Sequence, residues 1–212
     1  MLFAILIVVG YLAGSIPAGY WLVRVTKGTD IRTVGSGNVG ATNVWRTYGR
    51  NYGLPVMLFD VAKGLIPALV ATLTVSHLAG VLAGTAAMVG HARPLFMKFQ
   101  KGGKMVATTG GAILGVAPLV GLAAIAVFLV VFLIGRYVSL GSIVATASLA
   151  PIAAALGEPW PVIVMGGVAF VAVVVLHRTN IARLRTGTES RANLRRRKGA
   201  AAAPAPTPTP TP

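Results

Sequence analysis

Apolar residues run through this chain in stretches long enough to cross a lipid bilayer. Residues 118–135, 137–156 and 160–176 contain no charged side chain, and each approaches the length of about 20 residues that a membrane-spanning helix needs. A soluble domain has roughly a quarter of its residues charged, whereas the charged fraction here is 11%. We therefore expect an all-α integral membrane protein, in which lipid takes the place of water around the helices.

The apolar runs predict about seven transmembrane helices. We interpret the first run as a retained span and not a signal peptide, since no basic residue precedes it, and expect Gly14, Pro17 and Gly19 to bend its far end. Two runs, 78–90 and 105–117, are short for spans, so they are either tilted short helices or a re-entrant pair. The predicted spans are, in order, residues 1–23, 52–75, 78–90, 105–117, 118–135, 137–156 and 160–176.

The positive charges predict how the helices are oriented. With seven crossings, residues 24–51, residues 91–104, the turn at Arg136 and the tail from His177 onward fall on one face, and they hold all but one (Lys63) of the 19 Lys and Arg residues. Cytoplasmic loops carry such an excess of cations. We therefore expect a multi-pass membrane protein, with the amino terminus outside and the carboxyl terminus in the cytoplasm.

The chain divides into two parts by composition. Residues 1–189 form the predicted membrane-embedded domain, and residues 190–212 form a tail that is first basic and then rich in Pro, Thr and Ala. The cations at 195–198 suit anionic lipid headgroups. We expect residues 200–212 to be disordered or polyproline-like and to have no catalytic role.

The first polar segment contains a glycine turn before a short predicted helix at 41–48. Ser36 or Asn38 could cap that helix, and a helix start with exposed N–H groups is a ready anion site. Asn43 and Arg46 would share one helix face. A capped interfacial helix with a glycine turn is the alternative interpretation. The turn reads VGSGNVG and its glycines are Gly35, Gly37 and Gly40.

The second polar segment reads KGGK, with Lys101 and Lys104 on either side of Gly102 and Gly103. Two cations and two free backbone amides could converge on a phosphate there. The segment lacks the spacing of a Walker A loop. The alternative is a pair of ordinary cytoplasmic lysines at the end of a span.

Two further polar segments follow Arg136 and the last span. Ser139 and Ser142 lie one turn apart, where serines often donate only to a backbone carbonyl of their own helix. His177 and Asn180 would share a face, near Arg178 and Arg183. His177 is one of few candidate general bases on this face.

Together the four segments predict an enzyme that handles anionic phosphate substrates at the cytoplasmic leaflet. The chain has no cysteine, which excludes thiolate catalysis and cysteine metal sites. No metal site is expected, because Asp30, Asp60, Glu158 and Glu189 are scattered whereas magnesium needs clustered carboxylates. A membrane transporter of organic phosphate or other anions and a catalytically silent membrane subunit remain as alternatives.

These motifs resemble the bacterial acyl-phosphate:glycerol-3-phosphate acyltransferase family over residues 14–189. That family is a seven-helix membrane enzyme, so the resemblance implies transfer of a fatty acyl group from acyl phosphate to the 1-hydroxyl of glycerol 3-phosphate. The products would be lysophosphatidic acid and phosphate, in the first acylation of phospholipid synthesis. The matching motifs are GSIPAGY (14–20), VGSGNVGATNVWRTYG (34–49), FDVAKG (59–64), GH and KGGK.VAT (90–108), RYVSLGSI (136–143) and HRTNIARLRTGTE (177–189).

The resemblance also implies the site residues. We expect no cofactor and no nucleic acid, and a monomer that contacts membrane lipids and binds acyl phosphate and glycerol 3-phosphate. The family usually reads KFKGGKGVAT, whereas this chain has an apparent insertion at Gln100 and Met105 in place of a glycine. The expected catalytic residues are His177, Asn180, Ser36, Arg46 and Lys104, and the expected substrate-binding residues are Gly35, Gly37, Asn38, Asn43, Lys101, Gly102, Gly103, Ser139 and Ser142.

Overall fold

The computed structural model describes residues 1–192, and the rest of the predicted tail lies outside them. Within these residues the chain is helical and has no strand. Its elements are α1 (Leu2–Gly14), α2 (Ala18–Lys27), the 3-10 helix η1 (Ile31–Thr33), α3 (Ala41–Tyr48), α4 (Arg50–Thr74), α5 (His77–Ala92), the 3-10 helix η2 (Leu95–Met97), α6 (Val106–Val116), α7 (Pro118–Gly135), α8 (Val138–Ala155), α9 (Trp160–Leu176) and α10 (Arg178–Arg185).

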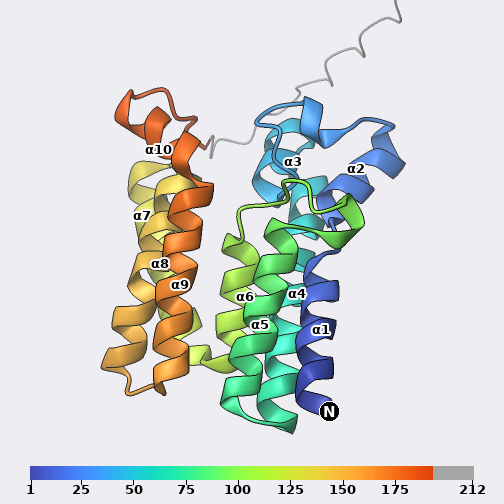
Figure 1. Ribbon diagram of the computed structural model, residues 1–212. Coiled ribbons are helices and arrows are strands. Elements are labelled where there is room, and N and C mark those ends of the chain that lie inside the picture. Colours follow the sequence, from blue (N-terminus) through green and yellow to red (C-terminus); the bar gives the residue numbers. More distant parts are fainter. Residues whose placement is uncertain (193–212) are drawn as a thin grey trace, which may run out of the picture.

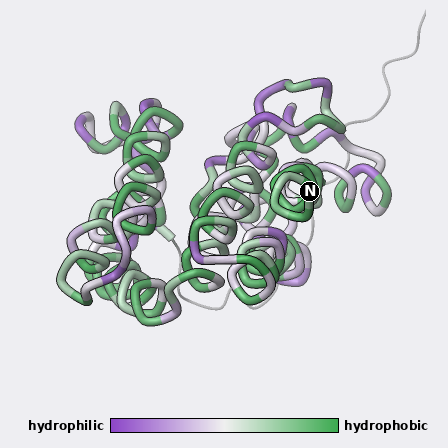
Figure 2. Tube along the Cα trace, turned by 60° about the horizontal axis from the view of Figure 1, so that its bottom comes forward, coloured by the Kyte–Doolittle hydropathy of each residue, from purple (hydrophilic) through white to green (hydrophobic). Residues whose placement is uncertain are grey.

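The long helices form two groups that lie side by side (Figure 1). In the first group α4 packs against α5 and α6, and α1 packs against α5. In the second group α8 lies between α7 and α9. The groups meet where α9 contacts α5 and α6 and where α6 continues into α7. Apolar residues cover the long helices of both groups, whereas the hydrophilic residues gather in the connections and short helices (Figure 2).

Every predicted apolar run is helical, and the first is divided between α1 and α2, so the expected all-α architecture is confirmed. Within residues 1–192, four stretches are long and apolar enough to cross a membrane: Leu2–Lys27, Arg50–Thr74, Pro118–Gly135 and Val138–Ala155. Trp160–Leu176 becomes a fifth when it is taken together with α10, from which it is bent by 65°. Helices α5, with 16 residues, and α6, with 11, are shorter. In Figure 1, α5 runs along most of the first group, whereas α6 covers only part of its length.

The first predicted span ends differently from the expectation. Residues 1–23 were predicted to be one bent helix, but α1 stops at Gly14 and α2 begins at Ala18. Pro17 lacks an N–H group and disfavours helical dihedral angles in the residue before it. The result is a break, which we call the elbow (residues 15–17), and the helix after it leaves the bundle.

Close helix contacts depend on residues without a side chain. A Cβ atom on Gly14 would lie 2.1 Å from the carbonyl oxygen of Ala87 in α5, and one on Gly111 would lie 2.0 Å from that of Val61 in α4. Small residues let helix backbones approach closely where lipid supplies no hydrophobic driving force between helices. Glycine therefore sets the distance between α1 and α5 and between α4 and α6.

The polar connections gather at one end of the molecule, which is the upper end in Figure 1. Helices α2 and α3, the 93–105 loop and α10 all lie there. The sequence prediction that these segments share one face is therefore met, and this end holds most of the expected site residues.

Candidate active site

The glycine turn before α3 is held together by the side chain of Asn43. Its Nδ2 group donates to the carbonyl oxygens of Ile31 (3.3 Å), Val34 (3.1 Å) and Asn38 (2.9 Å), and its Oδ1 accepts the N–H of Ser36 at 2.8 Å. Asn43 is buried and every polar group of its side chain has a partner within the protein. Asn43 therefore shapes the turn, and its predicted role in substrate binding stays a prediction.

The predicted cap of α3 is also different. The residue that caps the helix is Gly40, with no side-chain cap, while Oδ1 of Asn38 accepts the N–H of Gly40 at 2.8 Å. Nδ2 of Asn38 donates to the carbonyl oxygen of Gly102 at 3.4 Å, which joins the first polar segment to the second. Ser36 lies exposed in the turn, and Gly35 and Gly37 have positive φ values of 60° and 67°, which glycine adopts without strain.

The KGGK loop uses its backbone amides inside the protein. The N–H groups of Gly102 and Gly103 donate to the carbonyl oxygens of Ala92 and His91, each at 3.0 Å, at the end of α5. The expectation of two free amides for a phosphate is therefore wrong. Lys101 is exposed and lines a small cavity of about 30 Å³ with Leu176, Arg178 and Thr179.

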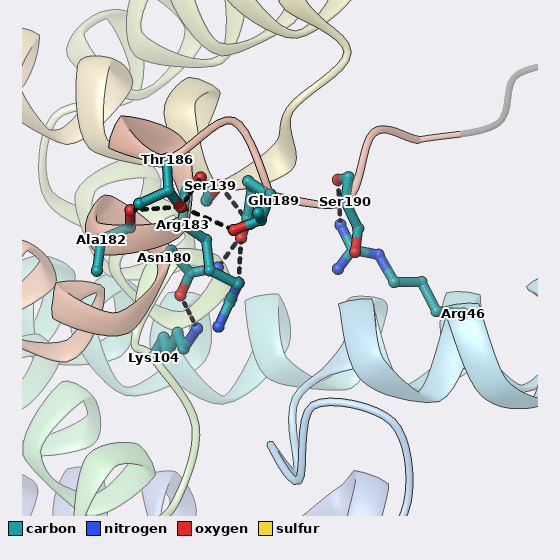
Figure 3. Close-up of polar contacts among 10 residues, drawn as sticks. Arg46, Lys104, Ser139, Asn180, Ala182, Arg183, Thr186, Glu189 and Ser190 are labelled. Carbon is teal, nitrogen blue, oxygen red and sulfur yellow. Dashed lines mark hydrogen bonds and ion pairs between the residues drawn. The ribbon is translucent and has the colours of Figure 1, made fainter.

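Lys104 turns the other way and faces α10. Its ammonium group donates to Oδ1 of Asn180 (Figure 3). Burial, together with the nearby cations Arg183, Lys101 and Arg46, lowers the pKa of Lys104 to about 8 against the opposing effect of Glu189. Lys104 is therefore a cation with few counter-charges, which is a suitable partner for a phosphate.

Glu189 organises the other side of this site, and sequence reasoning missed it. Its Oε1 accepts from Ser139 and from Nδ2 of Asn180, both at 2.7 Å, and its Oε2 accepts from Nε of Arg183 at 2.7 Å (Figure 3). Burial alone would raise the pKa of Glu189, but these three hydrogen bonds outweigh it and lower the pKa. Glu189 thus stays ionised and fixes the amide of Asn180 with its oxygen toward Lys104.

A signal for Glu189 was present in the sequence. It is one of only four acidic residues in a chain with a net charge of +15, and it follows Arg183 by six positions. Such a carboxylate among many cations is more useful as the centre of an ion-pair network than as a metal ligand. Arg183 was named only as a neighbour, yet it is the direct partner of this carboxylate.

His177 lies at the bend between α9 and α10. It is 4% exposed, and its Nδ1 lies 2.9 Å from the carbonyl oxygen of Val173. A carbonyl only accepts, so Nδ1 carries the proton and Nε2 has the lone pair. Burial and the charge of Lys104 lower the pKa of His177 to about 4, so the ring is neutral at physiological pH.

The two serines of α8 behave differently from each other. Ser139 donates to Glu189, whereas Ser142 donates to the carbonyl oxygen of Val138 in its own helix at 2.8 Å. The local hydrogen bond considered as the alternative for these serines therefore holds for Ser142. The substrate-binding role predicted for Ser142 stays a prediction.

The segment after α10 crosses the site and links the two helix groups. Arg46 on α3 donates from Nη2 to the carbonyl oxygen of Ser190 at 3.2 Å (Figure 3). The guanidinium of Arg136 donates to the carbonyl oxygen of Ala192 at 2.9 and 3.1 Å, and Nε of Arg191 donates to the Tyr137 hydroxyl at 2.9 Å. The contacts therefore continue past the predicted domain boundary at residue 189.

The structure thus places the predicted site segments at one end of the molecule, and five of the predicted residues lie where the two helix groups meet. Asn43, Gly102, Gly103 and Ser142 are engaged in internal hydrogen bonds. No group of three or more His, Asp or Glu side chains that could hold a metal occurs among residues 1–192. The residues that converge at the junction of the two helix groups are Arg46, Lys104, Ser139, His177 and Asn180.

Comparisons with known proteins give this arrangement a family. The family described as "Glycerol-3-phosphate acyltransferase" matches residues 4–187. A curated protein of that name from Geobacter sulfurreducens is 49% identical over 189 residues, which cover 88% of this chain and 96% of the relative. One from Aquifex aeolicus is 45% identical over 188 residues, with 88% of this chain and 97% of the relative covered.

Solved structures agree with the sequence relatives. A crystal structure of PlsY, described as an integral membrane glycerol 3-phosphate acyltransferase in its glycerol 3-phosphate form, superimposes with a TM-score of 0.87 at 42% identity. The match covers 91% of this chain and 96% of that one. The lysophosphatidic acid form superimposes with a TM-score of 0.84. This chain belongs to the glycerol-3-phosphate acyltransferase family of integral membrane proteins.

Proposed function

We propose that this chain transfers a fatty acyl group from acyl phosphate to the 1-hydroxyl of glycerol 3-phosphate, giving lysophosphatidic acid and phosphate. The observation that carries the proposal is that Lys104 donates to Asn180 at the polar end of the helix bundle, with Arg46 near enough for its charge to lower the pKa of Lys104. Membership of the acyltransferase family supports the reaction type, and the related PlsY structures are described in glycerol 3-phosphate and lysophosphatidic acid forms. An anion transporter is not favoured by this family.

The site must overcome the repulsion between two phosphate groups, each of which carries about −1.5 to −2 at neutral pH. Arg46 and Lys104 offer fixed positive charge, while Asn180 and His177 offer neutral polar groups beside them. We assign these four residues to glycerol 3-phosphate. In a partly dry groove their attraction is stronger than in water and needs little reorganisation during the reaction.

The acyl phosphate is assigned to the neighbouring glycine turn. Ser36 and Asn38 lie in this turn, whose shape depends on Asn43, and Asn38 contacts the carbonyl oxygen of Gly102. The acyl chain would lie between helices and enter from the bilayer, which is apolar like most residues of the long helices (Figure 2). Phosphate is a good leaving group, so the departing oxygen needs little help from a general acid.

Two groups could take the proton from the attacking hydroxyl. His177 has a free lone pair on Nε2, and a substrate phosphate oxygen is the other choice. We favour the substrate phosphate, with His177 as a binding residue. In His177→Ala and His177→Gln proteins the pH profile of kcat would then keep its shape while the KM for glycerol 3-phosphate rises. If the variants instead lost one limb of the pH profile of kcat, His177 would be identified as the base.

We further propose seven crossings of the bacterial inner membrane, with the amino terminus outside, the carboxyl terminus in the cytoplasm and the active site on the cytoplasmic face. The clustering of basic connections at one end of the bundle supports this orientation (Figure 1). We expect the protein to act as a monomer embedded in lipid, without a cofactor.

The first test is phosphate release by the purified, detergent-solubilised chain with palmitoyl phosphate and glycerol 3-phosphate. A parallel reaction contains palmitoyl-CoA, and no metal is added to either. Release that needs both substrates, with lysophosphatidic acid formed and the CoA reaction silent, is the expected result. Activity in the palmitoyl-CoA reaction and none in the palmitoyl phosphate reaction would make the donor assignment wrong. A folded protein that is inactive in both reactions would contradict the proposed activity.

A further inference from the structure

Three ionisable side chains meet inside the first helix group and take no part in the proposed reaction. Nζ of Lys63 lies 2.7 Å from Oδ1 of Asp60, and Nδ1 of His91 lies 3.5 Å from the same oxygen. All three residues are buried, with exposed fractions of 2 to 6%. Removing charges from water is costly, and replacing a buried ion pair by apolar residues is often neutral or stabilising. Stability alone therefore does not explain this cluster.

One side of the cluster holds the elbow between α1 and α2. Lys63 donates from Nζ to the carbonyl oxygen of Ile16 at 3.0 Å. That carbonyl lies just before Pro17, where the helix is broken. Lys63 thus supplies a second partner for this carbonyl oxygen, which also accepts the N–H of Ala18 at 3.1 Å.

The other side of the cluster holds the KGGK loop. The imidazole ring of His91 lies directly against Gly103, since a Cβ atom on Gly103 would come within 1.9 Å of Nε2. The carbonyl oxygen of His91 also accepts the N–H of Gly103 at 3.0 Å. His91 therefore contacts this loop through both its ring and its backbone. Both contacts are made at Gly103, the residue directly before Lys104.

We propose that Asp60, Lys63 and His91 are positioning residues that fix the KGGK loop and thereby place the ammonium group of Lys104 beside Asn180. Asp60 orients the ring of His91, the ring supports Gly103, and Lys104 follows directly. The inference rests on the proposed function only in its assignment of Lys104 to glycerol 3-phosphate. The three residues do not touch substrate; they act through the loop.

The variants are chosen so that no buried charge is left alone. His91→Ala removes the ring, whereas His91→Asn keeps a nitrogen near the place of Nδ1. The double variant with Asp60→Asn and Lys63→Gln removes both charges of the pair together. Thr72→Val on α4 is the matched control, because the Thr72 hydroxyl donates only to Ala68 in its own helix and lies away from the loop.

Two measurements on the detergent-solubilised full chain read out the position of Lys104. The first is the titration of ¹³C-methylated Lys104 by NMR, with Lys104→Arg to assign the signal. We expect the midpoint to move from about 8 toward the ordinary value of 10.5 in His91→Ala and in the double variant. His91→Asn should shift it less, and Thr72→Val should leave it unchanged.

The second measurement is the steady-state kinetics of acyl transfer. We expect the KM for glycerol 3-phosphate to rise on the order of ten- to a hundredfold, because small misplacements of a binding group have effects of this size. The KM for acyl phosphate should change by no more than about twofold, which is much less than the effect of a misplaced binding group.

Two results separate this inference from the proposed function. An unchanged Lys104 titration, with activity reduced only in proportion to folded protein, would make the cluster merely structural and overturn the inference. A wild-type chain without acyltransferase activity would instead overturn the proposed function. The NMR titration would still decide whether the cluster positions Lys104.

Discussion

Lys104 is a cation outside the spans whose pKa the fold changes strongly. Its pKa is lowered to about 8, so the free enzyme loses this cation as the pH rises through that value. The pH profile of kcat/KM for glycerol 3-phosphate reports the free enzyme. We therefore predict that kcat/KM falls above pH about 8 in the wild-type protein.

Lys104→Arg is the matched variant for this prediction, because a guanidinium stays protonated over the whole range. The variant is expected to have a lower kcat/KM, since its geometry differs, but its normalised profile should lack the limb near pH 8. A limb that persists in Lys104→Arg would assign the titration to another group.

Met105 shows how a residue can be tolerated in a conformation that favours glycine. Its φ is 70°, yet its side chain is 5% exposed and belongs to the main apolar core. A left-handed conformation costs about 1 kcal/mol or more for a non-glycine residue, whereas truncating a buried Met to Ala costs about 2–5 kcal/mol. The buried side chain therefore outweighs the backbone strain.

This balance predicts an order of stability for substitutions at Met105. Met105→Gly should lower the free energy of unfolding by about 1–3 kcal/mol, because relief of strain offsets part of the lost packing. Met105→Ala should lower it more, because it loses the packing and keeps the strain. Denaturant unfolding in detergent measures both values. A Met105→Gly protein more stable than wild type would show that strain dominates.

At the scale of helices, small residues at crossings set how closely the elements pack. We predict that Gly14→Ala disrupts the α1–α5 contact, since its Cβ would lie 2.1 Å from a backbone oxygen that cannot move aside cheaply. The thermal midpoint or the yield of folded protein should fall clearly. Gly167→Ala on α9 is the control, because nothing lies within 4 Å of its Cβ. Equal behaviour of the two variants would contradict the packing argument.

The positions of the helices were predictable from the sequence, whereas the hydrogen-bond partners of the polar groups were less predictable. Residues 118–135 and 160–176 have the bounds of α7 and α9 because lipid-facing helices are apolar all round and end where polar residues begin. The stop at Gly14 depends on Pro17 and was predicted only as a bend. Local composition therefore determines the long elements almost completely.

The site was predictable in location but not in its hydrogen bonds. The residue types around Arg46, Lys104 and His177 indicated phosphate chemistry, and the fold places them at one end. By contrast, the role of Glu189 depends on Ser139, 50 positions away, which no local pattern reveals. The amides of Gly102 and Gly103 were assigned to a ligand, but they donate to the end of α5. That contact forms only in the folded chain, and the local sequence does not reveal it.

At the scale of the whole molecule, the arrangement of charge predicts a topology that cysteine labelling can test. The chain contains no cysteine, so each introduced thiol is unique. His77 at the start of α5, Lys98 in the loop after α5, and Thr186 after α10 are all exposed. We expect a membrane-impermeant maleimide to label His77→Cys from outside intact inner membranes, and to reach Lys98→Cys and Thr186→Cys only after the membrane is opened.

The pair at His77 and Lys98 decides whether α5 crosses the bilayer. If α5 and α6 are two short crossings, the two thiols lie on opposite sides of the bilayer, as the course of α5 along the first helix group favours (Figure 1). If they form a re-entrant pair, Lys98→Cys would be labelled from the same side as His77→Cys or would stay protected after opening. Labelling of Thr186→Cys from outside would reverse the orientation inferred from the basic residues, and with it the side on which glycerol 3-phosphate must be supplied.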